Sequence, residues 1–207
     1  KLSALNEITG MITLAKNIPE VSKKILKKIC EQYNWQCGSF WQTDDEGLAL
    51  ENKSHYIKAS REVADYYERT TRYKFDCGSG FVGRAWQDKE SKWSEDLKDG
   101  EGFNDLTFSI RYGIMAVPIF VEDRIFAVFD FFDEKIKEPS KSLIELIETI
   151  GQQLALLSER LNAEKNLQES ERNYRSIVES ASEIIYRIDQ NGHFSYINQV
   201  GLKLTEY

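Results

Sequence analysis

Residues 112–132, YGIMAVPIFVEDRIFAVFDFF, contain two long apolar runs separated by a short acidic turn. The runs, residues 114–120 and 124–132, are rich in β-branched and aromatic side chains, and Glu122 and Asp123 lie between them. Apolar runs of this length around a tight polar turn are typical of a β-hairpin. The stretch therefore predicts two antiparallel strands near the centre of a sheet.

The sequence before this hairpin predicts helices and further strands. Apolar residues recur every three or four positions in residues 2–15 and 19–33, as amphipathic helices require, and residues 61–73 have the same period. Residues 38–43 and 48–57 lie on either side of a polar, glycine-containing turn and are expected to form a second hairpin. This order of elements predicts an α+β fold in which helices flank an antiparallel sheet.

One long C-terminal helix is expected from residue 142 to about residue 180. Its apolar positions alternate spacings of four and three, which is the heptad pattern of a coiled coil. They are Leu143, Ile147, Ile150, Leu154, Leu157 and Leu161. This seam either pairs with a second copy of the chain or packs on its own sheet and N-terminal helix. We expect a homodimer through the N- and C-terminal helices.

Composition excludes several classes of protein. The 207 residues carry a formal net charge of −7, and this acidic balance argues against nucleic-acid binding. No apolar run is long enough to span a membrane, so we expect a soluble chain without membrane contact. The three cysteines form no CxxC pair, and with only two histidines they supply no metal site. They indicate a reduced, cytoplasmic location.

Two stretches carry a resemblance to a known family. Residues 78–97, GSGFVGRAWQDKESKWSEDL, have a glycine-flanked turn entering a short helix, then Trp93 shortly before an Asp-Leu pair. The hairpin of residues 112–132 begins with a Gly-Ile pair and carries Pro118 on the same strand. Through these stretches, residues 4–161 resemble the GAF family of sensory domains. The resemblance implies a domain that binds a small molecule and passes its state to other parts of a signalling protein.

The chain departs from the family in ways that leave the ligand open. Ala127 stands where a glycine is usual in the last strand. Neither the Asn-Lys-Phe-Asp-Glu set of cyclic-nucleotide-binding members nor the Cys-His pair of bilin-binding members is present. The resemblance therefore implies a pocket, while the cofactor stays unknown.

The C-terminal residues 171–207, ERNYRSIVESASEIIYRIDQNGHFSYINQVGLKLTEY, resemble the N-terminal third of a PAS domain. Residues 184–189 and 193–198 are expected to be strands on either side of Asn191-Gly192, a strong hairpin turn. The matching features are Tyr174, Arg175, Ala181, Ser182, Tyr186, Asp189, Gly192, Tyr196 and Asn198, with Gln199 in place of a usual proline.

The GAF resemblance implies a ligand pocket walled by aromatic side chains. The expected lining residues are Trp41, Phe81, Trp86, Trp93, Phe103, Asn104, Phe108, Arg111, Tyr112 and Asp130. The aromatic members equally suit a plain core. Asp130 interrupts an apolar strand, where an unpaired carboxylate would be costly. It therefore meets a ligand or a basic side chain, or it faces water on an uncovered face.

Two alternative functions, phosphate binding and thiol catalysis, have less support in the sequence. Gly78, Gly80 and Gly83 suggest a phosphate-binding loop, but no Gly-Lys-Ser/Thr follows, and we favour a tight turn beside a short helix. Free-methionine sulfoxide reductases use thiols on a GAF-like fold. In this chain, Cys77 lies before the glycine turn and the following loop, residues 93–112, contains no cysteine. The thiols are therefore not placed as in those enzymes. We interpret the cysteines as inert and expect no catalytic residues.

These observations predict three segments. They are a GAF-like sensory domain in residues 1–138, a helical connector in residues 139–180 and an incomplete PAS-like segment in residues 181–207. The expected function is that of a non-catalytic sensor in a larger signalling protein, such as a sensor histidine kinase. It binds a small molecule and relays its state through a dimeric helix to a downstream effector domain in the same chain. The alternatives are a structural dimerisation scaffold with a filled pocket and a thiol-dependent reductase.

Overall fold

The computed structural model describes residues 2–44, 46–58, 64–65, 68–69, 71–95, 113–134 and 138–205. The chain divides into two compact units, Lys1–Glu159 and Arg160–Tyr207. Helix α5 (Lys141–Ser180) contributes residues to both units. The expected segment boundaries after residues 138 and 180 stay predictions. The expected helix of residues 61–73 falls mostly outside the described residues.

The first unit contains a six-stranded antiparallel sheet with the order β3-β2-β1-β6-β5-β4. Its strands are β1 (Cys37–Thr43), β2 (Ala49–Ile57), β3 (Lys74–Asp76), β4 (Lys92–Ser94), β5 (Gly113–Val121) and β6 (Arg124–Asp133). The two expected hairpins are β1–β2 and β5–β6, and they join through the central pair β1–β6. The predicted α+β class is confirmed.

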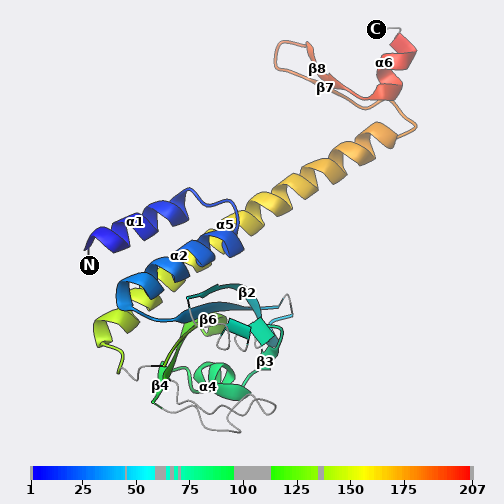
Figure 1. Ribbon diagram of the computed structural model, residues 1–207. Helices are drawn as coiled ribbons and strands as arrows, with labels where there is room; N and C mark the ends of the chain where they lie inside the picture. The colour runs from blue at the N-terminus through cyan, green and yellow to red at the C-terminus, as the bar shows by residue number, and fades with distance from the viewer. Residues whose placement is uncertain are drawn as a thin grey trace. The chain divides into compact units, whose positions relative to one another are not determined.

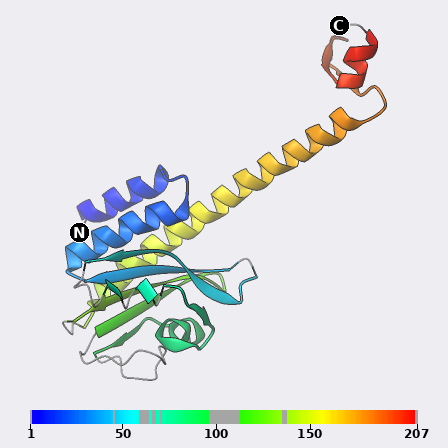
Figure 2. The same ribbon diagram turned by 45° about the vertical axis from the view of Figure 1, so that its right-hand side comes forward.

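Helices cover both faces of this sheet (Figure 1). Helix α2 (Ile18–Tyr33) and the first part of α5 lie on one face, with α1 (Leu2–Thr13) outside them, and α4 (Gly80–Asp88) lies on the opposite face (Figures 1 and 2). Asn17 caps α2 by accepting a hydrogen bond from the Glu20 amide at 2.8 Å. Within the described ranges, none of the helices combines the length and the apolar composition that a membrane crossing needs.

Helix α5 packs closely on the sheet. A Cβ atom added at Gly151 would lie 2.4 Å from side-chain atoms of Ile119 on β5, so any larger residue would have to displace Ile119. On its other side, Thr9 of α1 donates a hydrogen bond to Gln153 of α5 at 3.2 Å. The helix tolerates the poor helix propensity of Gly151 because the residue lets the helix approach the strand.

The glycines before α4 form a tight turn. Gly78 has φ = 83° and Gly80 has φ = 61°, in the region that favours glycine. A Cβ atom at Gly83 would lie 2.3 Å from the carbonyl oxygen of Asp76. The interpretation of this stretch as a tight turn beside a short helix is therefore confirmed.

The second unit contains the end of α5, a two-stranded hairpin and a short helix. The hairpin consists of β7 (Tyr186–Ile188) and β8 (Phe194–Ile197), and α6 (Gln199–Thr205) follows it. Asp189 holds the predicted turn, because its carboxylate accepts hydrogen bonds from the amides of Asn191 and His193, both at 2.9 Å.

Candidate functional site

Three polar side chains form a row across the central strands of the sheet. Ser39 of β1 pairs with His55 of β2 on one side and with Asp130 of β6 on the other. Residues that pair directly point to the same face of a sheet. Ser39 is fully buried, Asp130 is 5% exposed and His55 is half-buried. The row His55–Ser39–Asp130 is therefore a polar strip that is buried at Ser39 and Asp130 and half-buried at His55, and we call it the polar row.

The polar row lies on the face that α4 covers. Trp41, two residues beyond Ser39 on β1, belongs to a buried cluster that also contains Phe81 of α4. The Trp41 indole donates a hydrogen bond to Asp130 Oδ1 at 3.0 Å. The possibility that Asp130 faces water on an uncovered face is thus wrong, because the carboxylate is buried and hydrogen-bonded.

A β-bulge brings Asn52 beside His55. The pairing shifts between Phe40 and Trp41, so that Trp41 pairs with Asn52. Asn52 and His55 consequently share a face although they lie three residues apart, and His55 Nδ1 is 3.3 Å from Asn52 Oδ1. Burial, and then the charge of Lys23, lower the pKa of His55, which favours the neutral imidazole.

The Asn52 amide keeps one atom unsatisfied. Its Nδ2 is buried and has no hydrogen-bond partner among the residues that the structure describes. Reversing the amide would pair Nδ2 with His55 and leave Oδ1 unpaired instead. A buried polar atom without a partner costs about 1–3 kcal/mol. Asn52 is therefore a group that a water molecule or a ligand would satisfy.

Aromatic side chains surround these polar groups. Trp41 meets Phe75 edge-on with ring centroids 4.8 Å apart, and half-buried Trp86 of α4 packs against the same cluster. Trp93 differs, because it pairs with Met115, which in turn pairs with Phe131. This register assigns Trp93 to the α5 face, so the structure does not bring it to the polar row.

The remaining expected pocket residues, Phe103, Asn104, Phe108, Arg111 and Tyr112, lie outside the described residues. Of the ten expected, the structure brings four together around the polar row, namely Trp41, Phe81, Trp86 and Asp130. Among the described residues, no group of three or more His, Cys, Asp or Glu side chains could hold a metal ion.

A model of the GAF domain family matches residues 15–157. The chain belongs to the GAF domain family. GAF domains are small-molecule-binding signalling modules, and the sheet, α2, α4 and the first part of α5 all lie within the matched residues. None of the curated proteins compared with the chain matches it in sequence.

Solved structures share the fold at low sequence identity. The GAF domain from an Acinetobacter phosphoenolpyruvate-protein phosphotransferase matches with a TM-score of 0.63 and 15% identity, covering 78% of this chain and 94% of that one. The free methionine-R-sulfoxide reductase from Neisseria meningitidis, in complex with its substrate, matches with a TM-score of 0.61 and 14% identity, covering 77% and 89%. The A. aeolicus nlh2 GAF domain in an inactive state gives 0.57 and 21%, covering 76% and 94%. These likenesses show the fold alone.

The cysteines of this GAF domain do not form a reactive pair. Cys30 and Cys37 are buried, and burial raises the pKa of both thiols, that of Cys37 to about 12. They lie on opposite faces of β1, since Cys30 contacts the Gly38–Phe131 side and Cys37 belongs to the cluster beneath α4. Cys77 is exposed. Thiol chemistry needs an accessible thiolate, which neither buried cysteine provides.

The heptad seam packs on its own domain. Leu143, Ile147, Ile150, Leu154 and Leu157 are each at most 4% exposed within the single chain, while Leu161 is partly exposed. For these five buried residues the structure therefore favours the alternative, packing against the chain's own sheet and N-terminal helix, while the homodimer stays a prediction. A homodimer would have to use other residues.

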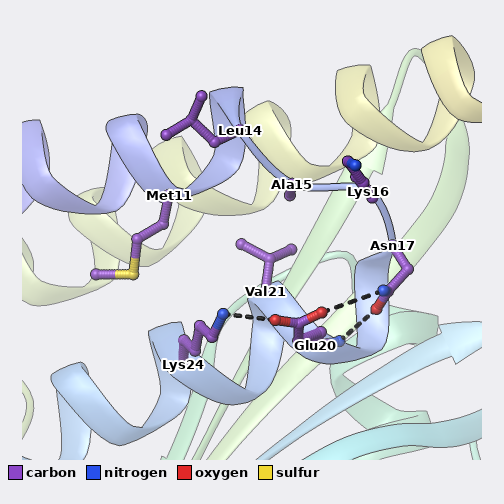
Figure 3. A pocket seen from close by; sticks show the side chains of 8 residues that line it. All are labelled: Met11, Leu14, Ala15, Lys16, Asn17, Glu20, Val21 and Lys24. Carbon is purple, nitrogen blue, oxygen red and sulfur yellow. Dashed lines mark hydrogen bonds and ion pairs between the residues drawn. The ribbon is translucent and has the colours of Figure 1, made fainter.

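A hollow of about 350 Å³ lies away from the polar row (Figure 3). It opens between the end of α1 and the start of α2, and its lining residues are Met11, Leu14, Ala15, Lys16, Asn17, Glu20, Val21 and Lys24. Its polar groups stabilise the helix start, because Glu20 interacts with both the Asn17 cap and Lys24 (Figure 3). We therefore assign it no ligand.

Sequence reasoning missed three members of the site, Ser39, Asn52 and His55. Each is a single polar residue on a strand and has no motif around it. The register between β1, β2 and β6 is what brings them together.

Proposed function

We propose that this GAF domain is the non-catalytic sensory part of a larger signalling protein, such as a sensor histidine kinase. It binds a small molecule on the α4 face of the sheet, beside the polar row. The observation that carries this proposal is the polar row His55–Ser39–Asp130 in aromatic surroundings, with Asn52 unsatisfied next to it. Ligand sites are typically apolar with a few convergent polar groups.

A core filled by the chain's own side chains would not need an unsatisfied amide at Asn52. An apolar residue at Asn52 would avoid the cost of an unpaired buried amide. A buried polar atom that has no partner among the described residues, as Asn52 Nδ2 has none, reduces stability, and such local violations are typical of functional sites. This difference favours a sensor over a structural scaffold whose pocket is filled by its own side chains.

The relay runs through α5. Strand β6 ends at Asp133 and α5 begins at Lys141, so the start of the helix lies only eleven positions after Asp130. The contact between Gly151 and Ile119 presses α5 on the opposite face of the same sheet. A ligand that binds one arrangement of the sheet better than another would shift the population of α5 positions.

The segment after α5 belongs to this proposal as the start of a PAS-like domain, and a downstream effector would follow it in the same chain. A homodimer would place two such helices side by side. Since the heptad seam is buried, we propose that exposed apolar residues of the first unit make the contact instead, among them Leu14 (83% exposed) on the segment after α1 and Leu156 (66% exposed) on α5.

Native mass spectrometry tests the proposal. The protein is purified from cells without added ligand and measured before and after mild denaturation. The sensor account expects a discrete extra mass per chain that disappears on denaturation and is reduced in Asn52→Leu. Leu167→Ala serves as a control, because this exposed side chain of α5 lies outside both the polar row and the proposed dimer contact. Bare wild-type chains that also gain no thermal stability from a metabolite panel would favour the scaffold.

A further inference from the structure

Asn198 is a fully buried polar residue of the second unit. Its side-chain Nδ2 donates to the carbonyl oxygen of Val178 at 3.1 Å and to that of Glu183 at 2.9 Å. Its Oδ1 accepts hydrogen bonds from the amides of Ile185 at 3.1 Å and Gly201 at 3.2 Å. Both donors and both acceptor positions of the amide are thus used.

These partners come from different segments. Val178 lies in the last turn of α5, Glu183 and Ile185 lie between α5 and β7, and Gly201 lies in the first turn of α6. The bond to Gly201 is an N-cap, since Asn198 directly precedes α6. The Asn198 backbone adds a bond from its own amide to the Ile185 carbonyl at 2.9 Å.

Glu179, next to Val178, makes a second connection. Its carboxylate accepts a hydrogen bond from the Tyr196 hydroxyl at 2.6 Å and from the Gln199 amide at 2.9 Å. Tyr196 lies on β8 and Gln199 begins α6. The same two bonds lower the pKa of Glu179, so the acceptor is ionised and these hydrogen bonds are charge-assisted.

The packing beside Asn198 leaves little room for adjustment. A Cβ atom at Gly201 would lie 2.4 Å from Ile197 and 2.9 Å from Ile184. Helix α6 therefore approaches the hairpin as closely as a glycine permits. A displacement of the last turn of α5 relative to β8 would break several hydrogen bonds at once.

We propose that Glu179 and Asn198 form a rigid joint that makes the last turn of α5, the β7–β8 hairpin and α6 move as one body. A rotation or shift of α5 then reorients the hairpin directly. The two residues are positioning residues of the relay. The proposal concerns only residues 160–207, so it holds or fails independently of ligand binding by the GAF domain.

Spin-label distance measurements on the full chain test the joint. Labels are placed at exposed Gln168 of α5 and exposed Asn191 of the hairpin turn, in a Cys77→Ser background that leaves only buried native thiols. We expect a narrow distance distribution in this background and a broad one in Asn198→Ala and in Glu179→Ala. Asn173→Ala is the matched control, because Asn173 is an exposed residue of α5 and should leave the distribution narrow.

Hydrogen exchange separates loosening from unfolding. In Glu179→Ala, which removes a partly buried carboxylate, we expect the Gln199 amide to exchange about tenfold faster while β7 and β8 stay protected. In Asn198→Asp, which keeps the acceptor Oδ1 and replaces the Nδ2 donor by a second oxygen, the Gly201 amide should stay protected. A broad distribution in the background protein, or a narrow one in both alanine variants, would overturn the proposal.

Discussion

The indole of Trp41 donates a hydrogen bond to the carboxylate of Asp130 at 3.0 Å, between two central strands of the sheet. Trp41 is 1% exposed and Asp130 is 5% exposed, so the bond lies away from water. Hydrogen bonds to charged groups contribute about 1.5–3 kcal/mol to stability. This bond fixes one wall of the proposed pocket to one end of the polar row.

Trp41→Phe keeps an aromatic ring and removes the indole N–H. We expect a loss of about 1–3 kcal/mol in the free energy of unfolding, because a buried carboxylate loses a donor. Urea unfolding measures this loss. A double-mutant cycle with Asp130→Ala should give a coupling energy of about 1.5–3 kcal/mol. Effects that add within about 0.5 kcal/mol would contradict the assigned bond.

Gly151→Ala tests the contact between α5 and the sheet. Alanine has a helix propensity about 1 kcal/mol more favourable than that of glycine. The added Cβ would lie 2.4 Å from Ile119 atoms, and overpacking of this kind costs about 1–3 kcal/mol. We expect a lower melting temperature, restored in part by Ile119→Ala in the double variant. A variant more stable than the parent would show that α5 does not press on β5.

Leu154 and Leu156 form a matched pair on α5. Leu154 is fully buried, whereas Leu156 is 66% exposed. In the monomer, Leu154→Ala should lower the free energy of unfolding by about 2–5 kcal/mol, and Leu156→Ala should change it by about 0.5 kcal/mol or less. Denaturant unfolding at two protein concentrations measures both. If the Leu154→Ala loss depended on concentration, the seam would pair between copies after all.

The three thiols should react differently. At pH 8, exposed Cys77 should react with a thiol reagent in the native protein, and Cys30 and Cys37 should react only after unfolding. Burial keeps the latter two protonated, since the pKa of Cys37 is raised to about 12 and that of Cys30 is raised as well. Rapid native labelling of Cys30 or Cys37 would contradict the burial assigned to these two thiols.

The same burial predicts a pH dependence of stability. The pKa of Cys37 in the folded protein lies above its ordinary value of 9.0. The stability that the buried, protonated thiol contributes is therefore fully present below pH 9 and is lost as the pH rises toward about 12. Between pH 9 and 11, Cys37→Ala should lose about 1.4 kcal/mol less stability per pH unit than the parent. Equal slopes for parent and variant would mean that the thiol is solvated in the folded state.

Much of the fold is predictable from local patterns. The runs around Glu122 and Asp123 form β5 and β6, and Asn191-Gly192 forms the turn of the second hairpin. These elements follow from alternation, turn residues and helical period, which act over short distances. The heptad pattern did not decide what the seam packs against, because apolar spacing does not reveal whether a helix contacts another helix or the chain's own sheet.

The site was harder to predict because it depends on register. Asn52 and His55 would point to opposite faces in a regular strand. The bulge opposite Trp41 places them together, and nothing in the sequence near them marks it. Asp130 could be singled out as a polar residue in an apolar strand, but its partner Trp41 lies 89 positions away.

A crystal structure of the protein purified from cells distinguishes a ligand-binding sensor from a scaffold. We expect electron density for a bound small molecule on the α4 face, within hydrogen-bonding distance of the Asn52 amide and in contact with Trp41. The opposite result would be that the chain's own side chains pack closely over His55, Ser39 and Asp130, and that one of these packing side chains pairs with Asn52. That result would contradict ligand binding at this site. The protein would then be a scaffold with a filled core.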